Sequence, residues 1–343
     1  MKVLVVLTGG TIGSTVSNNV IDVTDSSVYR LIDMYNKRYN NGVEFEVHKP
    51  INILSENLDL QHWNILCKFL SNIDYSKYDG IIITHGSDTL PYTSALIGYC
   101  FNNIDIPIVI TASNYELSHP NSNGLHNFNQ AIMLIRNVNK GVYTIYRNNN
   151  NETVVYIPTR LKEADIYTGE FSSFGQMQFG YMINNRLITE IDSESLEEIY
   201  NNNDNIDIAN DFSKNIILVI KPYPGLDYSN IKLTSSTKAV LHTMYHSSTA
   251  CIEGNRNKDL RVFIERCRNS NIDVYGCSFN MSNSDRYASS KELLEAGLIP
   301  LNNICMESAY VKLVLAYNQS KVEPTEIMKR NIYFEYIEGK TYD

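Results

Sequence analysis

The chain has 343 residues, of which 43% are hydrophobic and 20% are charged, enough for a sizeable core and, by length, for two domains. Its formal net charge of −9 argues against nucleic acid or an anionic membrane as the main partner. No apolar stretch reaches the roughly 18 to 20 residues of a membrane helix. The N-terminal run MKVLVVLTGG also lacks the cleavage site of a secretory signal, so we expect a cytoplasmic protein.

The first half of the chain alternates strand-like and helix-like segments. In chain order we expect strands at 2–8, 43–54, 78–86, 106–112, 142–147 and 153–157, and helices at 28–39, 58–73, 91–102 and 123–137. The first strand, KVLVVLT, is a continuous apolar run, which is typical of a strand buried on both faces of a parallel sheet. Strands that alternate with helices indicate βαβ units, so the sequence predicts an α/β fold.

The second half begins after an acidic, asparagine-rich stretch at 186–212, which we interpret as a linker with a short helix at 194–200. Beyond it the alternation resumes, with strands expected at 215–225, 239–246 and 272–279 and helices at 259–269, 290–296 and 306–317. The sequence therefore predicts an N-terminal domain over 1–185 and a C-terminal α/β domain over 213–343. The four consecutive asparagines at 148–151 are interpreted as a polar loop without functional content.

The cysteine and histidine patterns indicate no bound metal. The six cysteines are widely spaced and form no C-x-x-C pair, which is typical of buried free thiols in a reducing compartment. The seven histidines are scattered as well. We therefore expect no disulfide framework, no metal and no organic cofactor.

The first buried strand ends in Gly9-Gly10-Thr11. The two glycines permit a tight turn and close approach of a substrate to the backbone. Thr11 presents a hydroxyl where backbone N–H groups can stabilise an anion. The same turn is compatible with an ordinary βα connection in which Thr11 caps a helix, and it lacks the G-x-G-x-x-G spacing of a dinucleotide-binding loop.

The second buried strand, GIIITHG, runs into Ser87 and Asp88. A carboxylate at the end of a buried strand is costly to desolvate unless it is paired or used, and open parallel sheets bind ligands at the carboxyl ends of their strands. Asp88 suits the ammonium group of an amino-acid substrate, with the Ser87 hydroxyl beside it. Alternatively, one of these two residues caps the helix expected at 91–102.

Together the two motifs resemble the signatures of the asparaginase/glutaminase family of amidohydrolases, in its cytosolic type I branch. The family's T-G-G-T-I and H-G-T-D-T runs stand here as TGGTI at 8–12 and HGSDT at 85–89. The resemblance extends over essentially the whole chain. In the first half it includes SENL at 55–58, SNGLHN at 122–127, where Asn123 stands in place of Asp, and the stretch 151–173 around Lys162. In the second half it includes Asn280-Met281, Tyr287-Ala288 and Ala296-Gly297. It implies a larger N-terminal domain with a mainly parallel sheet flanked by helices, and a smaller C-terminal parallel α/β domain.

The resemblance also implies an activity, the hydrolysis of the side-chain amide of L-asparagine, or of a related linear carboxamide, to the acid and ammonia. Thr11 would be the nucleophile that forms an acyl-enzyme. Ser87, Asp88 and Lys162 would form a second catalytic set that moves protons. No cofactor is implied.

The resemblance further implies how the substrate is held. The binding residues would be Ser55, Glu56, Gly86, Asp88 and Ala112. Asp88 would bind the α-ammonium, Ser55 would donate to the α-carboxylate, and a backbone N–H near Ala112 or Ser87 would stabilise the oxyanion. Family members form homodimers or homotetramers with active sites near a subunit interface, where Ser248 and Thr249 would reach a neighbouring site.

Three positions depart from the family pattern. The family has a tyrosine on a lid after its catalytic threonine, and that tyrosine helps to activate the nucleophile. This chain has Val20 or Ile21 at that place, and neither side chain can relay a proton. The hydroxyls of Ser14, Thr15 or Ser17 are available to replace the tyrosine hydroxyl. Ser87 keeps the hydroxyl of the usual threonine and loses the methyl group that stiffens χ1. Glu56 replaces the usual Gln or Ser. A carboxylate there would either bind the substrate ammonium or repel the substrate α-carboxylate, and it favours a substrate other than free asparagine.

Two alternative functions remain open. The missing lid tyrosine is compatible with a non-catalytic asparagine- or aspartate-binding descendant of the enzyme, which would be stabilised by ligand without turning it over. An ammonia-supplying subunit of a tRNA-dependent amidotransferase shares the same domain. That subunit has an extra N-terminal domain, whereas this chain begins at its first strand, and the acidic charge suits tRNA poorly.

Overall fold

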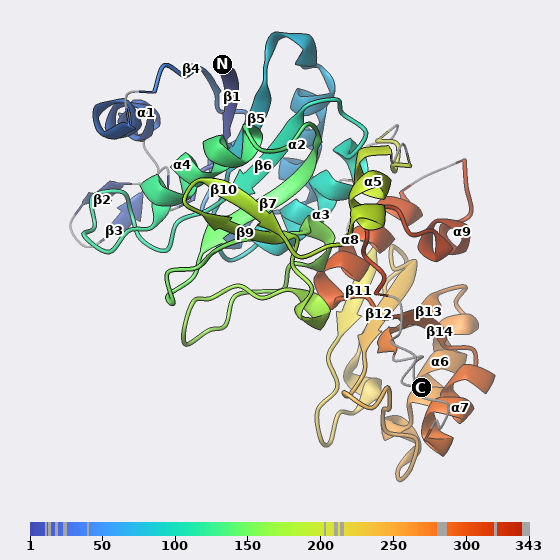
Figure 1. The fold of residues 1–343 in the computed structure, drawn as a ribbon. Coiled ribbons are helices and arrows are strands. Elements are labelled where there is room, and N and C mark those ends of the chain that lie inside the picture. Colours follow the sequence, from blue (N-terminus) through green and yellow to red (C-terminus); the bar gives the residue numbers. More distant parts are fainter. Residues whose placement is uncertain are drawn as a thin grey trace. The chain divides into compact units, whose positions relative to one another are not determined.

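The computed structural model describes residues 1–10, 12, 15–17, 20–22, 26–39, 41–201, 204–208, 212, 216–279, 287–318 and 321–337. By its internal contacts the chain divides into two compact units, Met1–Ile208 and Ala209–Asp343 (Figure 1). Within the described residues, no helix has the length and apolar character needed to cross a membrane.

An eight-stranded sheet forms the centre of the first unit, in the order β10-β9-β8-β7-β6-β5-β1-β4. Its strands are β1 (Lys2–Leu7), β4 (Glu44–His48), β5 (Gly80–Thr84), β6 (Pro107–Thr111), β7 (Gly141–Arg147), β8 (Thr153–Tyr156), β9 (Gly180–Ile183) and β10 (Arg186–Thr189). Five neighbouring strands are parallel to one another, in the order β4, β1, β5, β6 and β7. Strands β8, β9 and β10 continue the sheet beyond β7 in antiparallel pairs. The predicted mainly parallel sheet is therefore confirmed, with an antiparallel extension that makes it mixed.

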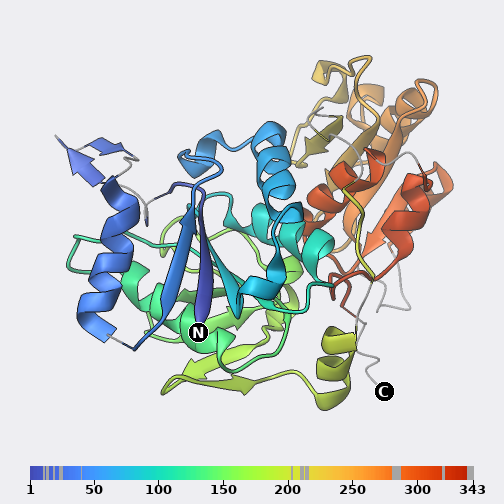
Figure 2. The same cartoon turned by 90° about the horizontal axis from the view of Figure 1, so that it is seen from above.

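Helices cover both faces of this sheet, as Figure 2 shows from above. They are α1 (Ser26–Tyr39), α2 (Leu60–Ser71), α3 (Leu90–Phe101) and α4 (Gly124–Ile135), with α5 (Ser193–Asn201) near the end of the unit. Helix α4 packs on β5, β6 and β7, and α3 packs on β7. This double cover explains why β5 and β6, with the sequences GIIIT and PIVIT, are buried at every residue.

A separate two-stranded sheet lies between β1 and α1 in the chain. It consists of β2 (Thr15–Ser17) and β3 (Val20–Asp22), which pair antiparallel. The two residues that stand at the place of the family's lid tyrosine, Val20 and Ile21, therefore lie on β3.

The stretch expected as a linker contains regular structure. Strand β10 extends the main sheet, and α5 lies where a short helix was expected, both within the first unit. Asn184 and Asn185 form the two-residue turn between β9 and β10, with φ angles of 50° and 63°. Such turns need positive φ at both positions, which asparagine tolerates better than most residues.

The second unit contains a four-stranded sheet in the order β11-β12-β13-β14, with every pair parallel. Its elements are β11 (Ile217–Ile220), β12 (Ala239–Thr243), α6 (Leu260–Arg268), β13 (Asp273–Phe279), α7 (Ala288–Glu295), β14 (Ile299–Asn302), α8 (Met306–Tyr317) and α9 (Pro324–Lys329). Helix α8 packs on β11, β12 and β13, and α6 packs on β13. The predicted smaller parallel α/β part is confirmed, and α9, only six residues long, was not expected.

A buried ion pair fastens the C-terminal segment to α8. Lys312 Nζ lies 2.6 Å from Glu335 Oε1, and both side chains are 0% exposed. Glu335 also accepts hydrogen bonds from the backbone N–H groups of Ile332 and Tyr333, and Lys312 donates to the Arg330 carbonyl. Because each charge is bonded on several sides, the cost of burying the pair is offset locally.

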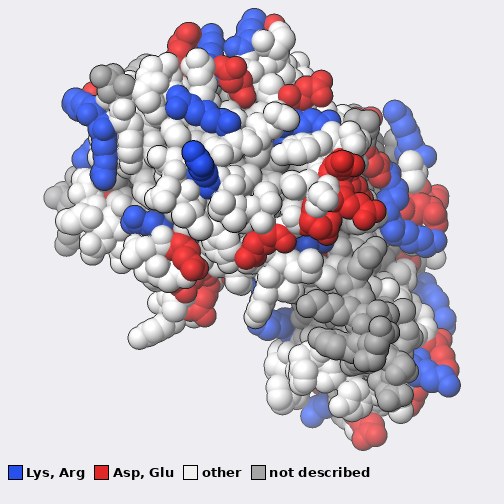
Figure 3. All heavy atoms as spheres, in the orientation of Figure 1, with Lys and Arg blue, Asp and Glu red and all other residues white. Residues whose placement is uncertain are grey.

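Acidic side chains gather over α5 on the face drawn in Figure 3, where Glu194, Glu197 and Glu198 lie. Lysines and arginines are spread over the same face without a continuous stripe, among the residues drawn in colour. Proteins that bind nucleic acid normally carry a continuous stripe of lysines and arginines along the path of the phosphate backbone.

Candidate active site

The two glycine-containing strand ends meet through their backbones. Gly10, which follows β1, has a φ of 73°, and a Cβ atom placed on it would lie 2.5 Å from both Cα and N of Gly86. The turn is held by the Gly10 N–H, which donates to the Ile53 carbonyl at 3.0 Å. Since no Cβ atom fits between these two backbone segments, only glycine at residue 10 permits their close approach. The motifs TGGTI and HGSDT are thus brought together.

Ser55 joins this crossing from the segment that follows β4. Its side chain is buried, and a Cβ atom on Gly86 would lie 2.4 Å from Ser55 Oγ. Ser55 Oγ donates to Asp88 Oδ2 at 3.2 Å, and Thr89 Oγ1 donates to the Ser55 carbonyl at 2.9 Å. Three of the predicted binding residues, Ser55, Gly86 and Asp88, are therefore neighbours, and Glu56 follows with an exposed side chain.

Asp88 is exposed and Ser87 is half-buried at the end of β5. Neither side chain caps the following helix, because the N-cap of α3 is Thr89 and makes no side-chain cap bond. The alternative interpretation of Ser87 or Asp88 as a helix cap is therefore wrong. The Asp88 carboxylate accepts the Ser55 hydrogen bond and keeps an exposed surface that a ligand cation can reach.

His85 separates the buried strand from this polar segment. Its backbone N–H donates to the Thr111 carbonyl at 2.8 Å, and its Nδ1 lies 2.8 Å from the Gly86 carbonyl. Burial lowers the pKa of His85 to about 4, so the ring is neutral at pH 7. A neutral ring with its Nδ1–H bonded to Gly86 fixes the backbone beside Ser87 without adding charge to the site.

Lys162 lies on a segment that reaches the start of α3. Its backbone N–H donates to the Ser172 carbonyl at 3.0 Å, and its side chain is exposed. Tyr92, in the first turn of α3, donates from Oη to Glu163 Oε1 at 2.5 Å. This bond links the residue next to Lys162 with the helix that follows Ser87. Within the described part of the chain, Ser87 and Lys162 share no hydrogen bond.

Two asparagines, Asn123 at the N-cap of α4 and Asn127 within α4, fix the chain around Ala112, which is buried after β6. Asn127 Nδ2 donates to the Ala112 carbonyl at 2.9 Å, and Asn123 Oδ1 accepts from the Asn114 N–H at 2.9 Å. Asn123 Nδ2 also donates to the Arg147 carbonyl at 2.9 Å. A carboxylate at residue 123 could not make this last bond, so asparagine in place of the family's aspartate adds a link to β7. Sequence reasoning noted the exchange and missed this role.

Several predicted residues lie outside the described part of the chain. They are Thr11, Ser14 and, from the C-terminal resemblance, Asn280 and Met281. The neighbouring Ile12 is described and buried. Among the described residues, no group of three or more His, Cys, Asp or Glu side chains is placed to hold a metal ion.

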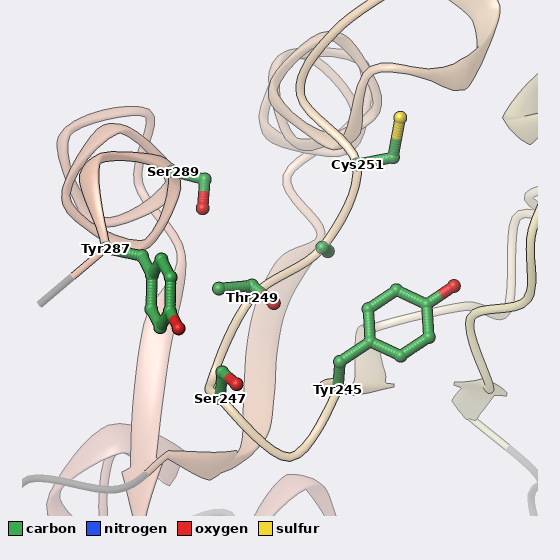
Figure 4. Close-up of a pocket in the computed structure, with 7 residues that line it drawn as sticks. Tyr245, Ser247, Thr249, Cys251, Tyr287 and Ser289 are labelled. Carbon is green, nitrogen blue, oxygen red and sulfur yellow. The ribbon is translucent and has the colours of Figure 1, made fainter.

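The second unit carries a pocket of about 430 Å³ at the end of β12 (Figure 4). It is lined by Tyr245, Ser247, Thr249, Ala250, Cys251, Tyr287 and Ser289. Thr249 thus lines an open pocket, whereas Ser248 is buried and its carbonyl accepts from Ser290 Oγ at 2.8 Å. Of the two residues expected to reach a neighbouring subunit, only Thr249 lines this pocket.

These features define an α/β protein whose polar site lies at the carboxyl edge of a parallel sheet, where open sheets bind small ligands. The family profile described as "Asparaginase, N-terminal" matches residues 2–196. The chain therefore belongs to the asparaginase family.

Relatives of known name agree with this assignment. An L-asparaginase of Thermococcus kodakarensis is 25% identical over 337 residues, covering 97% of this chain and 98% of the relative. A glutamyl-tRNA(Gln) amidotransferase subunit of Methanobrevibacter smithii is also 25% identical, over 98% of this chain and 77% of its own length.

Solved structures share the fold over nearly the full length. The thermostable L-asparaginase of Thermococcus kodakarensis superposes with a TM-score of 0.82 at 24% identity, covering 99% of this chain and 100% of its own. L-asparaginase I of Vibrio cholerae gives 0.72 at 19% identity, over 98% and 99% of the two chains.

Proposed function

We propose that this protein hydrolyses the side-chain amide of L-asparagine, or of a related linear carboxamide, to the acid and ammonia. The observation that carries the proposal is the convergence of Gly10, Ser55, Gly86 and Asp88. It gathers a hydroxyl donor and a carboxylate beside the strand end that leads to Thr11. A zwitterionic amino acid needs this pair of opposite functions, a donor for its carboxylate and an anion for its ammonium.

In the proposed reaction the Thr11 hydroxyl attacks the carboxamide carbon, and the amide nitrogen takes up a proton and leaves as ammonia. Water then cleaves the resulting ester and restores the Thr11 hydroxyl. Ser87 and Lys162 would move the protons, and backbone N–H groups near Ala112 or Ser87 would stabilise the oxyanion. The proximity of Tyr92 to Glu163 supports a place for Lys162 near the start of α3.

We assign the substrate α-carboxylate to Ser55 and the α-ammonium to Asp88. Glu56 would adjoin the carboxylate end and would repel a free α-carboxylate, so it would favour substrates in which that charge is absent or masked. The exposure of both Glu56 and Asp88 supports their direct contact with a ligand.

The same family relationship supports a homodimer or homotetramer in the cytoplasm. Asp88 and Lys162 are both exposed, and an acyl-enzyme site gains from the exclusion of water that a second chain can provide. Six free cysteines suit a reducing compartment.

A second candidate is an ammonia-supplying subunit of a larger amidotransferase. The observation in its favour is the 25% identity to the glutamyl-tRNA(Gln) amidotransferase subunit over 98% of this chain. It predicts that ammonia release depends on a partner protein or on tRNA.

Ammonia release from L-asparagine, L-glutamine, D-asparagine and an asparaginyl dipeptide tests the proposal. We expect release from at least one of them by the purified chain alone. Aspartate-dependent thermal stabilisation without any release would contradict hydrolysis and favour a binding protein. A Glu56→Gln variant should shift the preference toward free L-asparagine.

A further inference from the structure

The first turn of α3 is a firm support beside the candidate site. Helix α3 begins at Leu90, two residues after Asp88, and is buried at every residue except Tyr92. Thr93 Oγ1 accepts a hydrogen bond from Trp63 Nε1 of α2 at 3.0 Å. Because this turn is buried and bonded to a neighbouring helix, a group attached to it is held at a fixed place relative to the end of β5.

Tyr92 is half-buried and connects this support to the segment that carries Lys162. Its Oη donates to Glu163 Oε1 at 2.5 Å, and the two residues are 71 positions apart in the chain. Hydrogen bonds to an ionised carboxylate are shorter than those between neutral groups and roughly twice as strong. We name this bond the Tyr92–Glu163 latch.

The segment is also fixed on the other side of Lys162. Leu161 is buried and forms an isolated β-bridge with Ser173. The Lys162 N–H donates to the Ser172 carbonyl at 3.0 Å, and the 3-10 turn Pro158–Arg160 packs on α3. The backbone of Lys162 therefore lies between a buried bridge and the latch, so its exposed side chain leaves the chain from a fixed point.

A fixed starting point matters for a lysine that moves protons. Its ammonium group sits on a flexible four-carbon stem, so neighbouring residues must supply the order that the stem lacks. Proton transfer requires donor and acceptor atoms within about 2.6 to 3.2 Å of each other. A misplacement of about 1 Å can cost about 100-fold in rate.

We infer that Tyr92 and Glu163 are positioning residues, which set Lys162 against Ser87 for proton transfer. Ser87 lies just before α3 and Lys162 just before Glu163, so the latch joins the two segments on which the transfer depends. Neither side chain of the latch needs to touch the substrate. The inference rests on the proposed amide hydrolysis and adds two residues to its machinery.

The kinetics of ammonia release test the latch, with L-asparagine or the amide that the wild type hydrolyses best. We expect Tyr92→Phe and Glu163→Ala each to lower kcat at least about tenfold and to leave KM within about twofold. The double variant should be no slower than the slower single variant, because both changes break the same bond. The Tm should stay at the wild-type value, since the bond is on the surface.

Two further variants separate the bond from its surroundings. Glu163→Gln keeps an acceptor oxygen for Tyr92 and should retain at least about a third of the wild-type kcat. Tyr317→Phe is the matched control, because Tyr317 donates to the Asp273 carboxylate in the second unit, and it should leave kcat unchanged. An active wild type whose kcat is unchanged in Tyr92→Phe would overturn the latch alone, as would a change confined to KM. A wild type that releases no ammonia would overturn the proposed hydrolysis and the latch with it.

A background without the lysine shows whether the latch acts through Lys162. We expect Tyr92→Phe to cause no further loss of kcat when it is added to Lys162→Ala, measured at enzyme concentrations high enough to record the residual release. A further tenfold loss in that background would mean that Tyr92 acts through another group, and it would overturn the assignment.

Discussion

Ser55 Oγ donates a hydrogen bond to Asp88 Oδ2 at 3.2 Å, although the two residues are 33 positions apart in the chain. The contact depends on Gly86, because a side chain there would occupy the space of the serine hydroxyl. It also depends on the Thr89 hydroxyl, which holds the Ser55 carbonyl at 2.9 Å. The donor proposed for the substrate carboxylate and the anion proposed for its ammonium are thus set side by side before a substrate binds.

A Ser55→Ala substitution tests this pair. The change removes the hydroxyl that donates to Asp88 in the free protein and would turn to the substrate carboxylate in the complex, so we expect KM to rise by about tenfold, which corresponds to about 1.4 kcal/mol. The fold should be unaffected. Ser76→Ala is the matched control, since Ser76 donates to Asp74 at 2.6 Å on the exposed surface. An unchanged KM in Ser55→Ala would remove Ser55 from the binding site.

The crossing of Gly10 and Gly86 makes a second prediction. Gly10→Ala places a methyl group 2.5 Å from the backbone of Gly86, so we expect it to abolish activity and lower Tm. Gly42→Ala is the control, because Gly42 has a similar φ of 69° and nothing within 4 Å of its Cβ position. The control should cost only about 1 kcal/mol. Equal losses in the two variants would show that backbone strain, and not the crossing, matters.

The meeting of Gly10 and Gly86 could be predicted from the sequence because both residues follow strands of one parallel sheet. Buried strands of β-branched residues predicted β1 and β5, and parallel strands place their carboxyl ends on one edge. The family resemblance implied only that Ser55 and Asp88 bind the same substrate, and their direct contact was not expected, since Ser55 belongs to a short 3-10 turn with no periodic pattern. The bracing role of Asn123 has no sequence signal beyond its exchange for aspartate.

The elements that sequence reasoning missed are short. Strand β10 has four residues, and its alternation of exposed and partly buried positions was hidden in an acidic, polar stretch. The dipeptide Asn184-Asn185 is a turn signal that could have revealed the hairpin. Helix α9 begins at Pro324 and has only six residues, less than two turns, which is too short for a helical period to appear.

The buried ion pair predicts a large loss of stability when one partner is removed. Lys312→Met leaves Glu335 charged and unpaired at 0% exposure, which costs about 3 to 5 kcal/mol. We expect a clear fall in the free energy of unfolding measured with urea. Lys291→Met removes a lysine that is 76% exposed on α7 and should change it by less than about 0.5 kcal/mol. A small effect at Lys312 would mean that this segment is not needed for stability.

Two buried histidines predict a fall in stability in mild acid. Burial lowers the pKa of His85 and His242 from 6.5 to about 4. The unfolded chain takes up protons below about pH 6.5 while the folded chain does not, so stability is full above that pH and falls as the pH drops toward 4. Each residue contributes about 3 kcal/mol over this window.

Thermal unfolding at pH 7.5, 6 and 5, at constant ionic strength, measures this effect. We expect Tm to fall steadily, and the His85→Gln/His242→Gln variant to show a flatter profile than the wild type. A wild-type Tm that stays level or rises toward pH 5 would contradict neutral burial of the two rings.

The rate of ammonia release from L-asparagine by Thr11→Ala, compared with wild type and with Thr234→Ala, tests the central claim most directly. Thr234 lies in an exposed turn of the second unit, so its variant should keep the wild-type rate. We predict that Thr11→Ala, folded by circular dichroism, loses at least about three orders of magnitude, since no acyl-enzyme can form without the hydroxyl. A Thr11→Ala variant that keeps the wild-type rate would contradict a threonine nucleophile at this site.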